Sequence, residues 1–129
     1  MTIFDQLVSK TIMHVPGPIV SVFARKYIAG EVLDDALNLT RKFNAEGLMA
    51  TIDVLGEFIT NKNEALFFKD QGLEVLRAIE KSGIQANLSI KPTQMGLQLD
   101  SDFARVNIEE LVAAARKIDN FVRIDMEDI

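Results

Sequence analysis

The spacing of hydrophobic residues predicts that the chain begins with helices. Over residues 4–27 hydrophobic side chains recur every three or four positions, and a Pro-Gly-Pro at 16–18 interrupts them, which predicts two short helices. A third helix is predicted between Gly30 and Gly47, because glycine readily takes the positive φ with which many helices end. Residues 1–46 are therefore expected to form an N-terminal helical segment.

Three short hydrophobic runs after this segment are predicted to be β-strands. They cover residues 48–55, 84–91 and 121–126 and are too short for buried helices. The first run is mainly apolar and is bounded by glycines, which favours a strand covered on both faces.

Two further helices are predicted between these strands. Asn61 is followed three residues later by Glu64, the pattern of a capping box, and a hydrophobic stripe with helical spacing continues from there to Gly83. The same pattern at Asn107 and Glu110 predicts the start of the second helix. The order strand, helix, strand, helix, strand implies right-handed crossovers and a parallel sheet.

The predicted fold class is therefore α/β, with about three parallel strands and their crossover helices over residues 47–129. The sequence ends three residues after the last predicted strand, and no helix follows to cover that strand. A complete β/α barrel of the TIM type needs about 250 residues. We expect residues 1–129 to be a single incomplete domain, the N-terminal portion of a distorted barrel of this type.

Composition and charge exclude several classes of protein. The 129 residues are 48% hydrophobic and 26% charged, which is typical of a folded globular chain. The net charge of −5 offers no general attraction for a phosphate backbone, so nucleic acid is not expected as a partner. The chain has no cysteine, no signal-peptide pattern and no apolar run long enough to span a bilayer, which favours a cytoplasmic protein.

Charged residues close each predicted strand at its carboxyl end, where α/β folds place their active sites. Because this pattern is repeated at all three strands, it indicates the rim of an active site. These residues are Asp53 and Glu57 for the first strand, Lys91 for the second, and Asp125, Glu127 and Asp128 for the third.

The residue types leave several roles open. Lys91 could bind an anion, form a Schiff base or be a solvated lysine. Asp125 is expected to face away from its neighbours on the strand, into a barrel, where a buried carboxylate needs a partner. Glu57 suits a cap as well as a functional role, and Glu127 and Asp128 are expected to be solvated carboxylates. No ligand spacing among these residues supports a metal site.

Four segments of the chain carry a family resemblance, namely YIAGE, TIDVLGE, NLSIKPTQMGLQLD and NFVRIDMED. They resemble, in the same order, segments of the monofunctional bacterial proline dehydrogenases, and the resemblance runs collinearly from about Tyr27 to Asp128. It implies a distorted β/α barrel with noncovalent FAD that oxidises L-proline to Δ1-pyrroline-5-carboxylate by hydride transfer to the flavin and passes electrons to quinone. A peripheral contact with the inner membrane is left open.

The resemblance also implies roles for individual residues. Lys91 matches the lysine that contacts the proline carboxylate, and Asp125 matches the active-site aspartate associated with the substrate and that lysine. Met126 matches a position that touches the flavin, and Glu57 matches a glutamate that pairs with an arginine as a gate over the substrate.

The resemblance stops before the later strands and the final helix of the family barrel, which hold its Arg-x-x-Glu substrate clamp and most of its FAD contacts. We therefore expect weak or absent activity from these 129 residues alone. Two alternative hypotheses are an aldolase-like or lyase-like barrel in which Lys91 forms an imine, and a non-catalytic fragment whose unpaired sheet edges bind a partner.

Overall fold

The computed structural model describes residues 32–56 and 59–127. By its internal contacts the chain divides into two units, Met1–Val32 and Leu33–Ile129. The described helices and strands belong to the second unit. The two helices predicted over residues 4–27 lie outside the described residues.

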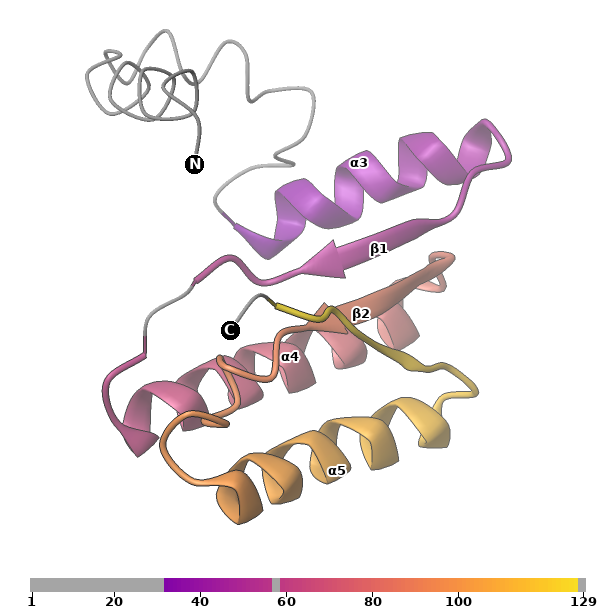
Figure 1. Cartoon of the computed structure of the whole chain (residues 1–129). Helices are drawn as coiled ribbons and strands as arrows, with labels where there is room; N and C mark the ends of the chain where they lie inside the picture. The colour runs from indigo at the N-terminus through magenta and orange to yellow at the C-terminus, as the bar shows by residue number, and fades with distance from the viewer. Residues whose placement is uncertain (1–31, 57–58, 128–129) are drawn as a thin grey trace, which may run out of the picture. The chain divides into compact units, whose positions relative to one another are not determined.

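The second unit alternates helices and strands. Its strands form one parallel sheet in the order β1-β2-β3 (Figure 1). This confirms the predicted α/β class and the parallel sheet, and the arrangement is that of a partial β/α barrel. The elements are α3 (Leu33–Ala45), β1 (Ala50–Asp53), α4 (Lys62–Ser82), β2 (Ala86–Ile90), α5 (Ser101–Lys117) and β3 (Val122–Ile124).

The strands are shorter than the hydrophobic runs that predict them. β1 keeps four residues of the run 48–55, and β3 keeps three of the run 121–126. β2 is buried along its whole length, whereas the prediction that the first strand is covered on both faces is wrong. β1 lies at the edge of the described sheet, and Met49 and Leu55 on either side of it are largely exposed.

Both ends of α4 agree with the sequence pattern. The Asn61 side chain accepts a hydrogen bond of 3.0 Å from the N–H of Glu64, and the Glu64 carboxylate accepts one from the N–H of Thr60. At the other end Gly83 has a φ of 67°, a conformation that costs glycine little. The local sequence therefore determines where this helix begins and ends.

The predicted start of α5 at Asn107 is wrong. The helix begins at Ser101, and its N-cap is Asp100, whose carboxylate accepts a hydrogen bond of 3.0 Å from the N–H of Phe103. Asn107 is buried in the helix, and its Nδ2 donates to the carbonyl oxygen of Met95 over 3.0 Å. An Asn-x-x-Glu pattern inside a helix cannot be told from a capping box by sequence alone. The contact with the Met95 carbonyl oxygen, 12 residues earlier in the chain, shows that the Asn107 amide does not cap the helix.

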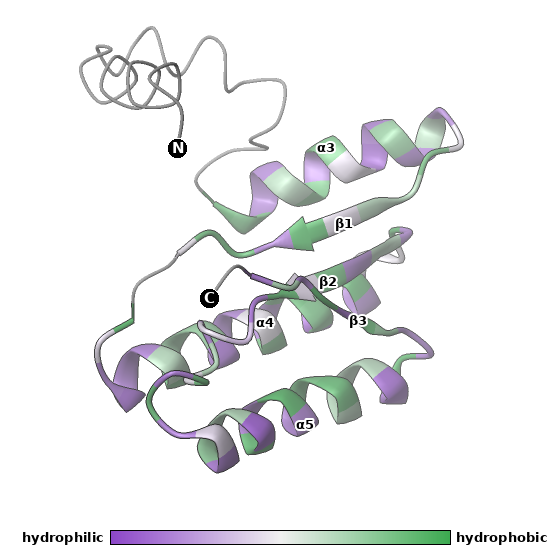
Figure 2. Cartoon of the chain, in the orientation of Figure 1, coloured by the Kyte–Doolittle hydropathy of each residue, from purple (hydrophilic) through white to green (hydrophobic). Residues whose placement is uncertain are grey.

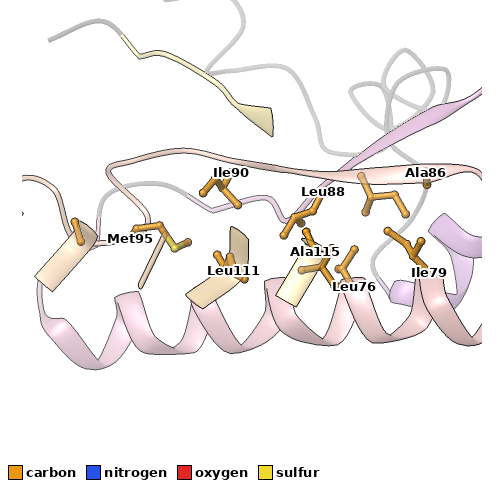
Figure 3. Close-up of a cluster of buried hydrophobic side chains, with 11 residues drawn as sticks. Leu76, Ile79, Ala86, Leu88, Ile90, Met95, Leu111 and Ala115 are labelled. Atoms are coloured by element: carbon orange, nitrogen blue, oxygen red, sulfur yellow. The ribbon is translucent and has the colours of Figure 1, made fainter. Parts of the chain in front are cut away.

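The core lies between β2 and the two helices α4 and α5, which pack against each other and against the sheet. Figure 2 shows hydrophobic and hydrophilic residues interleaved along the helices, as expected where one side of each helix is covered. Figure 3 shows the side chains that meet in this core. Those labelled there are Leu76, Ile79, Ala86, Leu88, Ile90, Met95, Leu111 and Ala115.

Gly72 allows the closest approach within this core. A Cβ atom at position 72 would lie 2.9 Å from Cδ2 of Leu111 and 3.2 Å from Cδ2 of Leu88. Because α4 has no side chain there, leucines from α5 and β2 fill the space beside its backbone. One hydrophobic contact thus joins three elements.

Leu111→Ala is expected to lower the free energy of unfolding by about 2–5 kcal/mol, because it leaves a cavity among α4, α5 and β2. The neighbouring Val112→Ala is the matched control. Val112 is 45% exposed, so its truncation is expected to change the same quantity by no more than about 0.5 kcal/mol. Urea titration of both variants measures the difference, and equal losses would contradict the proposed core.

Asp100 is expected to make the stability depend on pH. Its hydrogen-bonded ion pair with Lys62, 2.7 Å long, and then its bond to the N–H of Phe103 lower its pKa below the ordinary aspartate value. Because the folded pKa is the lower one, this stabilisation is complete above the unfolded pKa of about 3.9. It is lost as the pH falls through the folded pKa.

Asp100→Asn keeps a capping oxygen but removes the charge. The stability difference between wild type and this variant is therefore expected to be constant near neutral pH and to shrink on acidification below about pH 4. Thermal melts at several pH values measure it, with Lys62→Met as a second way to remove the pair. Parallel acid profiles for wild type and Asp100→Asn would contradict this assignment.

Candidate active site

One face of the sheet is polar. Leu88 of β2 points into the core, so the alternation along a strand turns Ser89 to the opposite face. Ser89 is in register with Asp53 on one side and Arg123 on the other. We call this side the polar face. In a β/α barrel the face away from the helices lines the interior. The polar face consists of Thr51, Asp53, Asn87, Ser89, Arg123 and Asp125.

Asp125 is held at both of its carboxylate oxygens. Its Oδ2 accepts a hydrogen bond of 2.9 Å from the Ser89 hydroxyl, and its Oδ1 lies 2.7 Å from Nε of Arg123. Its backbone N–H donates to the carbonyl oxygen of Ile90 over 2.9 Å. The expected partners of this half-buried carboxylate are therefore present, and they come from both β2 and β3.

The turn after β2 binds the end of β1. Gln94 is buried, and its Nε2 donates to the carbonyl oxygens of Val54 and Gly56 over 2.7 and 2.5 Å. Its Oε1 accepts a hydrogen bond of 3.4 Å from the N–H of Lys91. One amide side chain thus joins the carboxyl ends of β1 and β2.

The same turn also binds the end of β3. The Thr93 N–H and hydroxyl both donate to Oε2 of Glu127, over 3.2 and 2.5 Å. Glu127 is therefore not the solvated carboxylate that its place in the sequence predicts. Because its partner lies 34 positions earlier in the chain, no local pattern signals this contact.

The structure brings Lys91 and Asp125 to the same edge of the sheet. Lys91 directly follows β2, where continued alternation places it on the same side as Ser89, and Asp125 directly follows β3. Met126 is 86% exposed. Glu57 lies outside the described residues, as does Asp128.

Sequence reasoning missed several side chains of this edge. Ser89 and Arg123 each stand two positions before a predicted site residue, so the period of a strand already places them on the same face. That spacing could have identified them. The role of Gln94 has no such signal, because its partners come from another loop.

The described residues contain neither a membrane-spanning helix nor a cluster of metal ligands. No helix in residues 32–56 and 59–127 is both long and apolar enough to cross a membrane. Within the same ranges, no group of three or more His, Cys, Asp or Glu side chains could hold a metal ion.

Comparison with known proteins identifies relatives of this chain, although no family model matches it. Proline dehydrogenase 1 of Bacillus subtilis is 33% identical over 105 residues, which are 81% of this chain and 35% of that protein. Proline dehydrogenase 2 of the same organism is 31% identical, over 83% of this chain and 35% of its own length. The chain is a homologue of bacterial proline dehydrogenases.

A protein of a second species shows the same relation. Proline dehydrogenase of Deinococcus radiodurans is 29% identical over 136 aligned positions, covering 96% of this chain and 44% of that protein. The resemblance to proline dehydrogenases is thereby confirmed. The chain spans 35% to 44% of the length of these relatives.

The link between Ser89 and Asp125 is expected to appear as a coupling free energy. In a double-mutant cycle of Ser89→Ala and Asp125→Ala, the free energies of unfolding should be non-additive by about 1 kcal/mol, because one hydrogen bond joins the two side chains. Arg123→Gln should lower the free energy of unfolding by only about 0–1 kcal/mol, since the Arg123 side chain is 59% exposed. Additivity of the first pair within about 0.3 kcal/mol would contradict the contact.

Proposed function

We propose that this chain provides part of the active site of a proline dehydrogenase, which oxidises L-proline to Δ1-pyrroline-5-carboxylate. The observation that carries the proposal is the Asp125 carboxylate, fixed by Ser89 and Arg123 at the edge of the sheet where Lys91 also lies. The homologues named proline dehydrogenase support it. In this reaction the C5 carbon of proline loses a hydride and the ring nitrogen loses a proton, which leaves a C=N bond.

Lys91 is proposed to bind the carboxylate of the substrate. An ammonium group on a flexible stem suits a single carboxylate, and the bond is stronger where the site excludes water. Asp125 is proposed to orient this ammonium group and to lie beside the substrate. Because both of its oxygens already have partners, Asp125 keeps one orientation without help from the substrate.

FAD is proposed as the cofactor, with Met126 touching it. Two observations support this role: Met126 is exposed beside Asp125, where its polarisable thioether can contact an aromatic ring, and the Thr93–Glu127 bond holds the next residue in place. FAD, when bound, accepts the hydride that leaves proline. The roles of the protein residues here are to bind and orient the substrate beside it.

Further parts of the proposal rest on the resemblance. Glu57 is proposed to pair with an arginine as a gate over the substrate. Quinone is proposed as the acceptor of the electrons, and the protein is proposed to work in the cytoplasm with peripheral contact to the inner membrane. The single-domain organisation of residues 1–129 also stays a prediction.

A chimera tests the proposed function. Residues 27–127 replace the matching part of Bacillus subtilis proline dehydrogenase 1, and the purified chimera is mixed with L-proline under anaerobic conditions. We expect the visible absorption of its flavin to bleach. Lys91→Met should reduce kcat/KM roughly 30-fold or more, because a lost charge-assisted contact costs about 2 kcal/mol or more.

The control for Lys91 is Lys81→Met, which removes an exposed lysine of α4 and should leave kcat/KM unchanged. A chimera that binds FAD but does not oxidise L-proline would overturn the proposal. Borohydride trapping of a carbonyl compound on Lys91 would instead support the imine-forming alternative. The 129-residue chain by itself, mixed with FAD and L-proline, is expected to show weak or no activity.

A further inference from the structure

Gln94 is a buried polar residue whose side-chain amide makes three hydrogen bonds, all to backbone groups. The residue is 2% exposed and lies in the turn after β2. Its Nε2 donates to the carbonyl oxygens of Val54 and Gly56, and its Oε1 accepts from the N–H of Lys91. It therefore spans the loop after β1 and the residue that the proposed function places against the substrate.

The loop that Gln94 binds is also fixed from its other side. A Cβ atom at Gly56 would overlap the ring of Phe68, so the backbone of Gly56 lies directly on that ring of α4. The segment 54–56 is thus held between an aromatic ring and the Gln94 amide. Little freedom remains for it to move relative to β2.

The turn that carries Gln94 is itself anchored. Met95 is 1% exposed and packs in the core, and Nδ2 of Asn107 in α5 donates to its carbonyl oxygen over 3.0 Å. Within the turn the Gln94 N–H donates to the carbonyl oxygen of Lys91 over 3.1 Å. Thr93 in the same turn binds Glu127, two residues beyond Asp125. All three strand ends therefore meet at one anchored turn.

We propose that Gln94 is a positioning residue, whose amide sets the place of Lys91 relative to the ends of β1 and β3. It is not a catalytic residue, because its amide is hydrogen-bonded to backbone groups of the protein. The position it imposes matters for catalysis only if Lys91 binds substrate, so this part rests on the proposed function. The positional part stands by itself.

Glutamine is the side chain that matches these partners. Two carbonyl oxygens need two N–H donors, and the Lys91 N–H needs an acceptor at the same group. Glutamate of the same length has no donor for the carbonyl oxygens, and leucine or methionine has neither donor nor acceptor. Either change leaves backbone groups of Val54, Gly56 and Lys91, which are half-buried residues, without this partner.

Hydrogen exchange in the full 15N-labelled chain tests the proposal, and Gln98 is the internal control because it is exposed in the same segment. In wild type the side-chain amide protons of Gln94 should exchange at least about tenfold more slowly than those of Gln98. In Gln94→Leu the Lys91 N–H should exchange at least about tenfold faster and its chemical shift should move. Gln98→Leu should change neither.

Leu111→Ala separates positioning from general destabilisation. It should lower the global stability and leave the chemical shift of the Lys91 N–H in the folded chain unchanged, whereas Gln94→Leu should move that shift. Equal exchange of the Gln94 and Gln98 side chains, or an unmoved Lys91 signal in Gln94→Leu, would overturn the proposal. The wild-type comparison needs no variant to fold, and no arm depends on the oxidation of proline.

Discussion

The structure depends on the two-sided character of β2. One side of this strand packs against α4 and α5, where Leu88 and Leu111 fill the space beside Gly72. Because side chains alternate along a strand, burying Leu88 and Ile90 forces Ser89 to the opposite face. The hydrophobic contact with the helices therefore also decides which polar groups line the other side. A shift of one residue in register would exchange the two sets.

The contacts within the polar face orient its side chains more than they stabilise the fold. The Arg123–Asp125 pair is partly exposed, and such pairs contribute little to the free energy of folding. Their effect is geometric, since protein groups bind both oxygens of Asp125. In the proposed function, a carboxylate fixed in this way needs no reorganisation when the substrate binds, and such preorganisation favours catalysis.

The carboxyl edge is held together by side chains that cross between loops. Gln94 joins the turn after β2 to the loop after β1, and Thr93 joins it to Glu127 after β3. Beyond the ends of the short strands, these side-chain hydrogen bonds take the place of backbone hydrogen bonds between the strands. They explain how strands of three to five residues can still hold their ends in a fixed arrangement.

Local sequence by itself determined the type and order of the described helices and strands, and both ends of α4. The cap at Asn61 and the glycine at 83 act through hydrogen bonds and φ angles within a few residues, so the bounds of α4 could be predicted. Alternation likewise placed Asp125 on the face away from the core. The start of α5 and the bounds of the strands could not be predicted in this way, since Asn107 bonds to a turn and β1 lies at the edge of the described sheet.

Tertiary structure alone decided which groups meet. Ser89 and Asp125 are 36 residues apart, Thr93 and Glu127 are 34 apart, and Gln94 is 38 from Gly56. The sequence shows that each of these residues can form hydrogen bonds, but partner and distance depend on how the helices pack on the sheet. Periodicity is a local property of the chain, whereas a site built across parallel strands exists only after the crossovers have formed.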